Sequence, residues 1–404
     1  MNKELIILKN IPVLNFHTIM THNKKRTWSF LSANIKVFEN TLKYLKKNGY
    51  KSISLQELYD LRTKKISDDS KLFIITFDDG FLDNYTIAYP MLKKYGFKAT
   101  VFVNPEFVDQ RPVVREQIYD RIVNGEDVET DASWGYMSWN ELKEIDDSGI
   151  FDVQCHGMTH TWYVVEPVIV DIHHSGDGYH WLWWNEFVDR KPLWLSDYCD
   201  TDIEIGTPVF KYGDSISAKR FFVNDDIVEF VKKECKGITF LDNKKKRLQY
   251  VNDLNREIDS KYRGNLGRYE TDDEYSDRLY NEIHLSKEVI EKKLNKEVRF
   301  LAWTTGGTPA VQLAQNIAKD AGYYSATDCS KAYNDLNDDP FYVYRIGGFS
   351  GHDLFGKQSL LFEKAFIRMQ LHRGSGEDFL FNRLLEGARR IYRRKDKKMG
   401  ENNR

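Results

Sequence analysis

The chain has 404 residues and carries 59 Lys and Arg against 61 Asp and Glu, so its formal net charge is −2. A chain of this length can bury one large core or two ordinary ones. The balanced charge gives no electrostatic reason to expect a nucleic acid partner, and we predict none. The 4 cysteines form no CxxC pair, which argues against a disulfide framework and for a reduced compartment.

The first part of the chain alternates strand-like and helix-like segments. The apolar patterns predict strands at 11–16, 72–77 and 99–103, and helices at 31–48, 55–62 and 84–95. Helices that separate consecutive strands imply parallel pairing with crossover connections. The sequence therefore predicts an α/β fold, either a barrel or a doubly wound sheet.

This alternation stops after residue 163 and returns near residue 272. Helices are expected near 225–233, 244–262, 272–294 and 310–321, strands at 298–303 and 323–326, and two closing helices at about 358–371 and 377–394. We expect 1–163 to form the first part of a barrel, 164–270 an insertion or lid subdomain, 271–356 the second part of the barrel, and 357–404 C-terminal helices with a basic tail.

A strand-like run at 71–80 ends on two adjacent acids, Asp78 and Asp79, followed by Gly80. Parallel α/β sheets place their chemistry at the carboxyl ends of such strands. Adjacent side chains diverge, so each acid can serve a different role. The competing interpretation is a simple turn that ends the strand, because Asp-Gly is common in turns.

A second strand-like run, 151–160, ends on His156 and His160. Two such histidines alone are often only surface or core residues. Here they follow a strand as the aspartates do, so the two motifs can meet at the same end of the predicted sheet or barrel. One carboxylate and two imidazoles suit a divalent metal with an open coordination position; zinc is the default for this set, with Co²⁺, Ni²⁺ or Fe²⁺ as alternatives. The sequence predicts a metal-dependent hydrolase.

These two motifs resemble those of a known family. TFDDGF at 76–81 and HGMTH at 156–160 are similar to the first two motifs of the polysaccharide deacetylases, the NodB-homology or carbohydrate esterase family 4 group. The segments IPVLNFHTI, LKYLKKNGYKSISLQEL, YPMLKKYGFKATVFV and SKEVIEKKLNKEVRFLAW are similar to its poly-N-acetylglucosamine deacetylase branch. The resemblance covers roughly 5–160 and 272–350, and implies a distorted (β/α) barrel of the NodB type with a large insertion and C-terminal helices.

The resemblance also implies roles for individual residues. Asp79, His156 and His160 would hold the metal, and Asp78 would be the general base. This division agrees with the chemistry, because a metal polarises the acyl carbonyl and acidifies water while a nearby carboxylate accepts the proton.

Two more residues are implied by late parts of the family pattern. Arg345 resembles an arginine that orients the base, although a surface salt bridge is the competing interpretation. His352 lies in the region of the final histidine motif and is a candidate acid for the leaving amine. His17 matches a family position near the start of the chain, and further candidate acids are His173, His174 and His180.

The third family motif is altered. Where relatives have an aromatic-Pro-Tyr-Gly stretch, residues 302–306 read AWTTG, without proline or a local arginine. We expect Trp303 and Thr304 to contact substrate, with a core role as the alternative for Trp303. The aromatic run 179–184 of the insertion, which includes Trp183, is expected to stack on sugar rings or to form the core of a small subdomain.

The expected function is hydrolysis of N-acetyl groups on a sugar of a surface polysaccharide or its precursor. The same chemistry would serve an O-deacetylase, a deformylase or a cyclic-amide hydrolase, and a decayed carbohydrate-binding protein is the non-enzymatic alternative. Because 1–17 does not resemble a signal peptide, we expect a cytoplasmic protein, with the inner face of the membrane as the alternative location. A lipid-linked sugar is among its candidate substrates. The basic run 389–398 is either a contact with anionic lipid or a solvated tail. The sequence does not indicate the oligomeric state.

Overall fold

The computed structural model describes residues 11–19, 32–66, 70–126, 128, 133–199, 201–329 and 334–346. Its centre is an eight-stranded sheet in the order β1-β5-β6-β7-β12-β13-β14, with β4 beside β5. Each neighbouring pair is parallel. The strands are β1 (Val13–Phe16), β4 (Tyr50–Ser52), β5 (Lys71–Phe77), β6 (Ala99–Val103), β7 (Phe151–Cys155), β12 (Phe300–Ala302), β13 (Ser325–Asp328) and β14 (Tyr342–Tyr344).

The two ends of this sheet meet. Just after β14, Ile346 forms a parallel bridge with Leu14 of β1. The amide of Asn15 donates to the carbonyl of Ile346 over 2.9 Å, and the amide of Ile346 donates to the carbonyl of Val13 over 2.8 Å. The sheet is thereby nearly closed into a barrel, which confirms the predicted α/β barrel.

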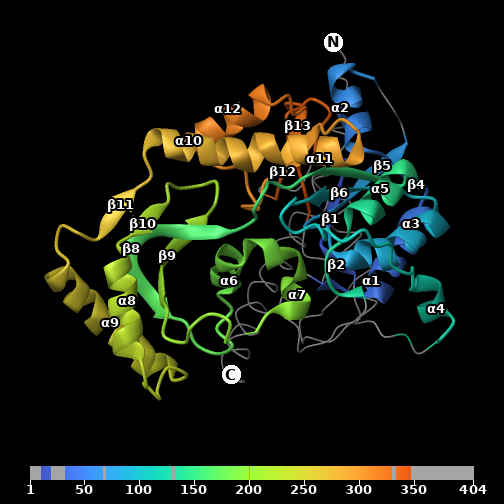
Figure 1. The fold of residues 1–404 in the computed structure, drawn as a ribbon. Helices are drawn as coiled ribbons and strands as arrows, with labels where there is room; N and C mark the ends of the chain where they lie inside the picture. Colours follow the sequence, from blue (N-terminus) through green and yellow to red (C-terminus); the bar gives the residue numbers. More distant parts are fainter. Residues whose placement is uncertain are drawn as a thin grey trace, which may run out of the picture.

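Helices cover the outside of the barrel (Figure 1). They are α1 (Ile35–Lys47), α2 (Leu55–Thr63), the π-helical segment η2 (Asn84–Ala88) continued by α3 (Tyr89–Tyr95), α4 (Tyr119–Val123), α5 (Trp139–Asp147), and α10 (Asp272–Tyr280), η5 (Asn281–Leu285) and α11 (Ser286–Leu294) in one run, followed by α12 (Gln312–Asp320). Three of these helices begin with a capping box, at Ser54, Ser138 and Thr271. The run 272–294 coincides with the single helix expected from the sequence.

The segment between β7 and β11 contributes no strand to the barrel sheet among its described residues. It contains β8 (Trp162–Ile172) paired antiparallel with β9 (Pro208–Asp214), and β10 (Phe221–Val223) paired with β11 (Gly267–Tyr269). Its helices are α6 (His180–Glu186), the 3₁₀ segment η4 (Val188–Leu193), α7 (Trp194–Asp197), α8 (Asp225–Cys235) and α9 (Lys244–Lys261). In Figure 1, β8 to β11, α8 and α9 form a lobe at the left of the barrel. The exact domain division stays a prediction.

Polar residues follow the barrel strands at their carboxyl ends. His17 follows β1, Asp78 follows β5, Asn104 follows β6, His156 follows β7 and Arg345 follows β14. Because the strands are parallel, these residues lie at the same mouth of the barrel. The fold thus gathers side chains that are up to 328 positions apart.

Residues 347–404 lie outside the described part of the chain. The prediction of closing helices at 358–371 and 377–394, the basic tail and His352 all fall there. Across the described residues, we find no helix with the length and apolar character needed to cross a membrane.

Candidate active site

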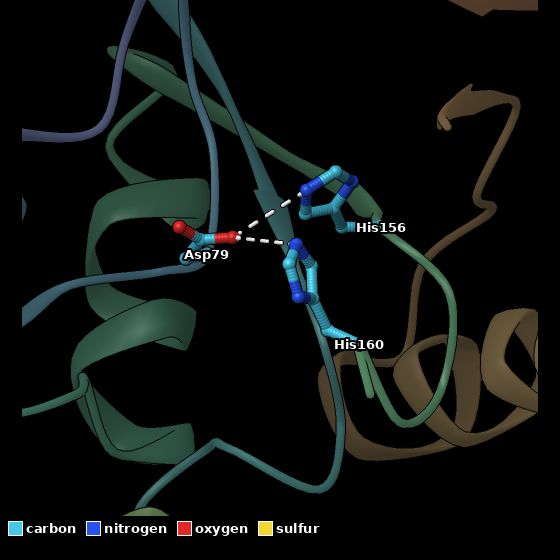
Figure 2. A group of neighbouring side chains, drawn as sticks. All are labelled: Asp79, His156 and His160. Carbon is cyan, nitrogen blue, oxygen red and sulfur yellow. Dashed lines mark ion pairs between the residues drawn. The ribbon is translucent and has the colours of Figure 1, made fainter. Parts of the chain in front are cut away.

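Asp79, His156 and His160 converge at the mouth of the barrel (Figure 2). Oδ1 of Asp79 lies 3.4 Å from Nε2 of His156 and 3.6 Å from Nε2 of His160. All three ligand atoms lie within 4.8 Å of one another. The structure therefore brings together the three residues that the sequence suggested as ligands.

These distances suit one small divalent cation. Ligand bonds of about 2.0–2.2 Å in a tetrahedral site place neighbouring ligand atoms about 3.3–3.6 Å apart. Three protein ligands with two nitrogens and one oxygen leave a fourth position open, as catalytic zinc sites do. The donor set thus fits a metal that can also bind water or substrate.

Two of the three residues have an uncommon backbone conformation. Asp79 has φ 71° and His160 has φ 42°, in the left-handed region that side chains other than glycine rarely adopt. Such conformations persist where the surrounding structure holds them, and they concentrate at functional sites. The strained backbone at Asp79 and His160 therefore supports a functional role for the positions of their ligand atoms.

The ring of His156 is oriented by its second nitrogen. Nδ1 lies 2.8 Å from the carbonyl oxygen of Ala302, so it carries the proton and donates it. This bond leaves the lone pair of Nε2 directed toward Asp79. Histidine ligands commonly have their outer nitrogen fixed in this way.

The loop 157–160 is held by buried polar contacts. Glu282 of η5 accepts hydrogen bonds over 3.1 Å from the amides of Met158 and Thr159, and a further one from the Thr159 hydroxyl. Lys191 of the insertion donates to the carbonyl of Thr159 over 2.6 Å and pairs with Glu106 over 2.7 Å. The position of His160 therefore depends on both the barrel helix and the insertion.

Replacing Lys191 with Met should weaken metal binding. The side chain is 1% exposed, and methionine keeps its apolar packing while losing both polar contacts. Loss of residues that support metal ligands typically costs about 10–100-fold in affinity, and we expect about tenfold because Lys191 acts through the backbone of Thr159. Competition with a chelating dye measures the Kd. Lys211→Met, which removes an exposed lysine of the same insertion, is the matched control, and equal affinities in the two variants would contradict this role.

Asp78 is held by partners other than the three candidate ligands. Its Oδ1 accepts from Nη1 of Arg345 over 2.5 Å, and its Oδ2 accepts from Nδ2 of Asn15 over 3.1 Å. Asn15 also accepts from Arg345 over 3.1 Å. Burial disfavours the charged form, but Arg345, His156 and His17 outweigh it and hold the pKa of Asp78 well below its usual range. Asp78 is therefore an ionised, firmly positioned carboxylate beside the metal site.

Among the described candidates for the proton donor, His17 is the one that lies beside Asp78. Its Nε2 lies 3.8 Å from Oδ2 of Asp78, and its side chain is 24% exposed. The insertion histidines lie in other contacts: Nδ1 of His173 lies 2.7 Å from Asp177, and Nδ1 of His174 lies 3.0 Å from the carbonyl of Ile172. The ring of His180 packs against Trp194.

The residues expected to contact substrate have other surroundings in the structure. Trp303 is 1% exposed within the main barrel core, and Trp183 is 0% exposed with its indole N–H bonded to Asp202 over 2.7 Å. Neither lines the pocket beside the candidate metal site. Thr304 lies beside the ligand loop, where its Cγ2 would be 3.5 Å from a Cβ placed on Gly157.

A pocket beside the candidate metal site is lined by two of the predicted ligands and by six further residues that the sequence did not single out individually. Its walls are Asp79, Phe81, Asn104, Phe107, Tyr136, His160, Trp184 and Trp194, and its space is about 310 Å³ including the open mouth. Trp184 belongs to the aromatic run 179–184 that was expected to bind sugar. The sequence therefore predicted the correct segment, but it singled out Trp183 rather than Trp184. Tyr136 and Asn104 carry no sequence signal of their own.

Comparison with known proteins identifies the domain. Residues 65–172, which include both motifs, match the family model described as polysaccharide deacetylase. The chain carries a polysaccharide deacetylase domain. The family resemblance of these motifs is thus confirmed.

Individual relatives agree with this assignment. YxkH of Bacillus subtilis (strain 168), provisionally named as a polysaccharide deacetylase, is 35% identical over 121 residues, which cover 30% of this chain and 41% of YxkH. The poly-β-1,6-N-acetyl-D-glucosamine N-deacetylase of Escherichia coli O157:H7 is 22% identical over 232 residues, covering 53% of this chain and 33% of that protein. The chain thus spans less than half the length of these curated relatives.

A solved structure supports the fold. The de-N-acetylase from Aggregatibacter actinomycetemcomitans superimposes with a TM-score of 0.50 and 16% sequence identity, covering 84% of this chain and 94% of that one. The likeness extends over most of both chains. It confirms the barrel architecture expected from the family resemblance.

Proposed function

We propose that this protein is a metal-dependent hydrolase that removes N-acetyl groups from an N-acetylated sugar of a surface polysaccharide or its precursor. The observation that carries the proposal is the convergence of Asp79, His156 and His160 at metal-ligand spacing beside the ionised Asp78. The polysaccharide deacetylase domain at 65–172 supplies the substrate class.

A divalent cation on Asp79, His156 and His160 would polarise the acyl carbonyl and acidify a water molecule. Asp78 accepts the proton of the attacking water as the new C–O bond forms at the acyl carbon. Arg345 keeps Asp78 ionised and fixes its direction. Arg345 also lowers the basicity of Asp78, so the proton transfer would depend on the acidity that the bound cation gives to the water.

His17 gives a proton to the nitrogen as the C–N bond breaks, so that the products are acetate and the amine. This assignment rests on its distance of 3.8 Å from Asp78 and its partial exposure at the mouth of the barrel. His352, which lies outside the described residues, is the alternative proton donor suggested by its sequence position.

Replacing His17 with Asn should lower kcat for acetate release by about 10²–10⁴-fold, the usual contribution of a general acid. KM and metal content should change little, because His17 is not among the metal ligands. His352→Asn serves as the comparison variant. Normal turnover in His17→Asn together with lost turnover in His352→Asn would assign the proton donor to His352.

The proposed substrate is an N-acetylated glucosamine polymer, the class named for the Escherichia coli relative. An O-acetyl ester, an N-formyl group or a cyclic amide would meet the same attacking groups. A protein that only binds carbohydrate would need neither the metal nor Asp78 for its function.

The test measures acetate release from β-1,6-linked N-acetylglucosamine oligomers, before and after removal of metal with a chelator. We expect release to stop without metal and to return with Zn²⁺, Co²⁺, Ni²⁺ or Fe²⁺. Parallel assays with O-acetylated and N-formylated sugars identify the acyl group. Oligosaccharide binding without any acyl release under all four metals would contradict the proposed hydrolase.

A further inference from the structure

The pocket beside the metal site has a mixed origin. Asp79, Asn104 and His160 belong to its lining, and the other five lining residues are aromatic. Trp184 and Trp194 come from the helices α6 and α7 of the insertion, while the remaining lining residues come from loops of the barrel. Flat aromatic surfaces of this kind pack on the apolar faces of ring-shaped ligands.

Asn104 supplies one hydrogen-bond acceptor in this pocket. Its Nδ2 donates to the carbonyls of His156 and Gly157, the latter over 3.2 Å. Both amide protons are used in these bonds, so the orientation of the amide is fixed and Oδ1 is left as an acceptor. Oδ1 is buried and has no hydrogen-bond partner among the described residues, in a side chain that is 1% exposed. A buried acceptor of this kind is expected to have a partner.

Tyr136 supplies one donor. The indole Nε1 of Trp194 donates to Oη of Tyr136 over 2.6 Å. Indole nitrogen can only donate, so Oη is the acceptor in this bond and keeps its own proton to give to another group. Among the described residues no hydrogen bond takes this proton, although the tyrosine is only 5% exposed.

The backbone also fixes Tyr136 beside the aspartate motif. Tyr136 forms an antiparallel bridge with Phe81, two residues after Asp79. Its carbonyl accepts from Nη2 of Arg115 over 2.8 Å, and its ring stacks on Phe81 with centroids 5.2 Å apart. The hydroxyl is therefore held in place before any ligand binds.

We propose that this pocket is a sugar-ring subsite in which Tyr136 Oη donates a hydrogen bond to, and Asn104 Oδ1 accepts one from, hydroxyl or acetamido groups of the substrate. The aromatic walls pack on the faces of the pyranose ring, and the two polar atoms bind its edge. A purely apolar acyl chain would leave both polar atoms unpaired, which is unfavourable in a buried site. This inference rests on the proposed carbohydrate substrate and makes the insertion part of substrate recognition.

The variant that tests the subsite is Tyr136→Phe, which removes the hydroxyl and keeps the ring. The probe is a β-1,6-linked N-acetylglucosamine pentasaccharide, and binding is followed by tryptophan fluorescence on the metal-free protein, since Trp184 and Trp194 line the pocket. We expect the Kd for the pentasaccharide to rise about tenfold, as for loss of one buried hydrogen bond. In the metal-loaded protein KM should rise by a similar factor while metal content is unchanged.

The matched control is Tyr212→Phe, because Tyr212 is a 39% exposed tyrosine of the insertion that does not line the pocket. An unchanged Kd in Tyr136→Phe, or a pentasaccharide that does not alter the fluorescence of the original protein, would overturn the subsite. If the pentasaccharide binds through Tyr136 but no acetate is released, the subsite stands and the proposed hydrolase fails.

Discussion

Replacing Asp78 with Asn is expected to reduce acetate release by at least about 10²–10⁴-fold and to leave the metal in place. The loss follows because asparagine cannot accept the proton of the attacking water. The metal should remain because its three ligand atoms belong to Asp79, His156 and His160. Steady-state rates and metal analysis on the same preparation measure the two effects, and a fully active Asp78→Asn variant would remove the proposed base.

Asp78→Asn should also lower the stability of the fold, and this effect has to be separated from the loss of the base. Arg345 is 2% exposed and its Nη1 lies 2.5 Å from Asp78. Removing one partner of a buried ion pair typically lowers the free energy of unfolding by about 3–5 kcal/mol.

A second variant, Asp78→Asn combined with Arg345→Met, removes both charges. We expect urea denaturation to show recovered stability in the double variant and acetate release to stay lost. Recovery of turnover together with stability would show that the activity loss of Asp78→Asn came from misfolding rather than from loss of the base.

Replacing His160 with Ala is expected to abolish both stable metal binding and turnover. Two ligands remain in this variant, and catalytic sites of this type need three protein ligands. Equilibrium dialysis against Zn²⁺ should give one ion per chain for the original protein and none for the variant. His284→Ala, which removes a half-buried histidine of η5 paired with Glu288 at 3.6 Å, is the control and should bind metal normally.

The metal affinity should also fall with acidification. Burial lowers the pKa of His160 to about 4, so this ring is already unprotonated at neutral pH. Burial favours the neutral form of His156 too, but Asp78 and Asp79 outweigh it and raise the pKa of His156 above its usual value. Metal binding at or below that pKa must therefore displace a proton from His156, and the apparent Kd should rise up to about tenfold for each pH unit below it.

Much of the barrel could be predicted from local patterns. The strand at Ala99–Val103 and the helix run 272–294 have the predicted bounds, because buried apolar runs and a capping box mark their ends. The strands Tyr50–Ser52 and Tyr342–Tyr344 were not predicted. They are three residues long, and only their pairing in the sheet distinguishes them from loop.

The candidate site likewise contains residues that the sequence predicted and residues that it did not. Asp78, Asp79, His156 and His160 could be named because each follows a recognisable strand in a compact motif. The contact between Arg345 and Asp78 spans 267 positions and was inferred from resemblance alone. Tyr136 and Asn104 could not be found, because their significance comes from hydrogen bonds to Trp194 and to the loop 156–157, which only the folded chain brings together.

Substrate contacts were the least predictable part. A tryptophan in the sequence is equally compatible with a core and with a binding surface, and its position relative to the pocket decides between them. Trp183 and Trp303 are core residues here, whereas Trp184 and Trp194 reach the pocket. Neighbours in the same aromatic run thus have different surroundings, which depend on how α6 packs against the barrel.

The most direct test of the metal site is a crystal structure of the zinc-loaded protein with an anomalous difference map recorded at the zinc absorption edge. We predict one strong peak about 2.0–2.2 Å from Oδ1 of Asp79 and from Nε2 of His156 and His160. A map with no peak between these atoms, or with zinc bound only at other residues, would contradict this prediction.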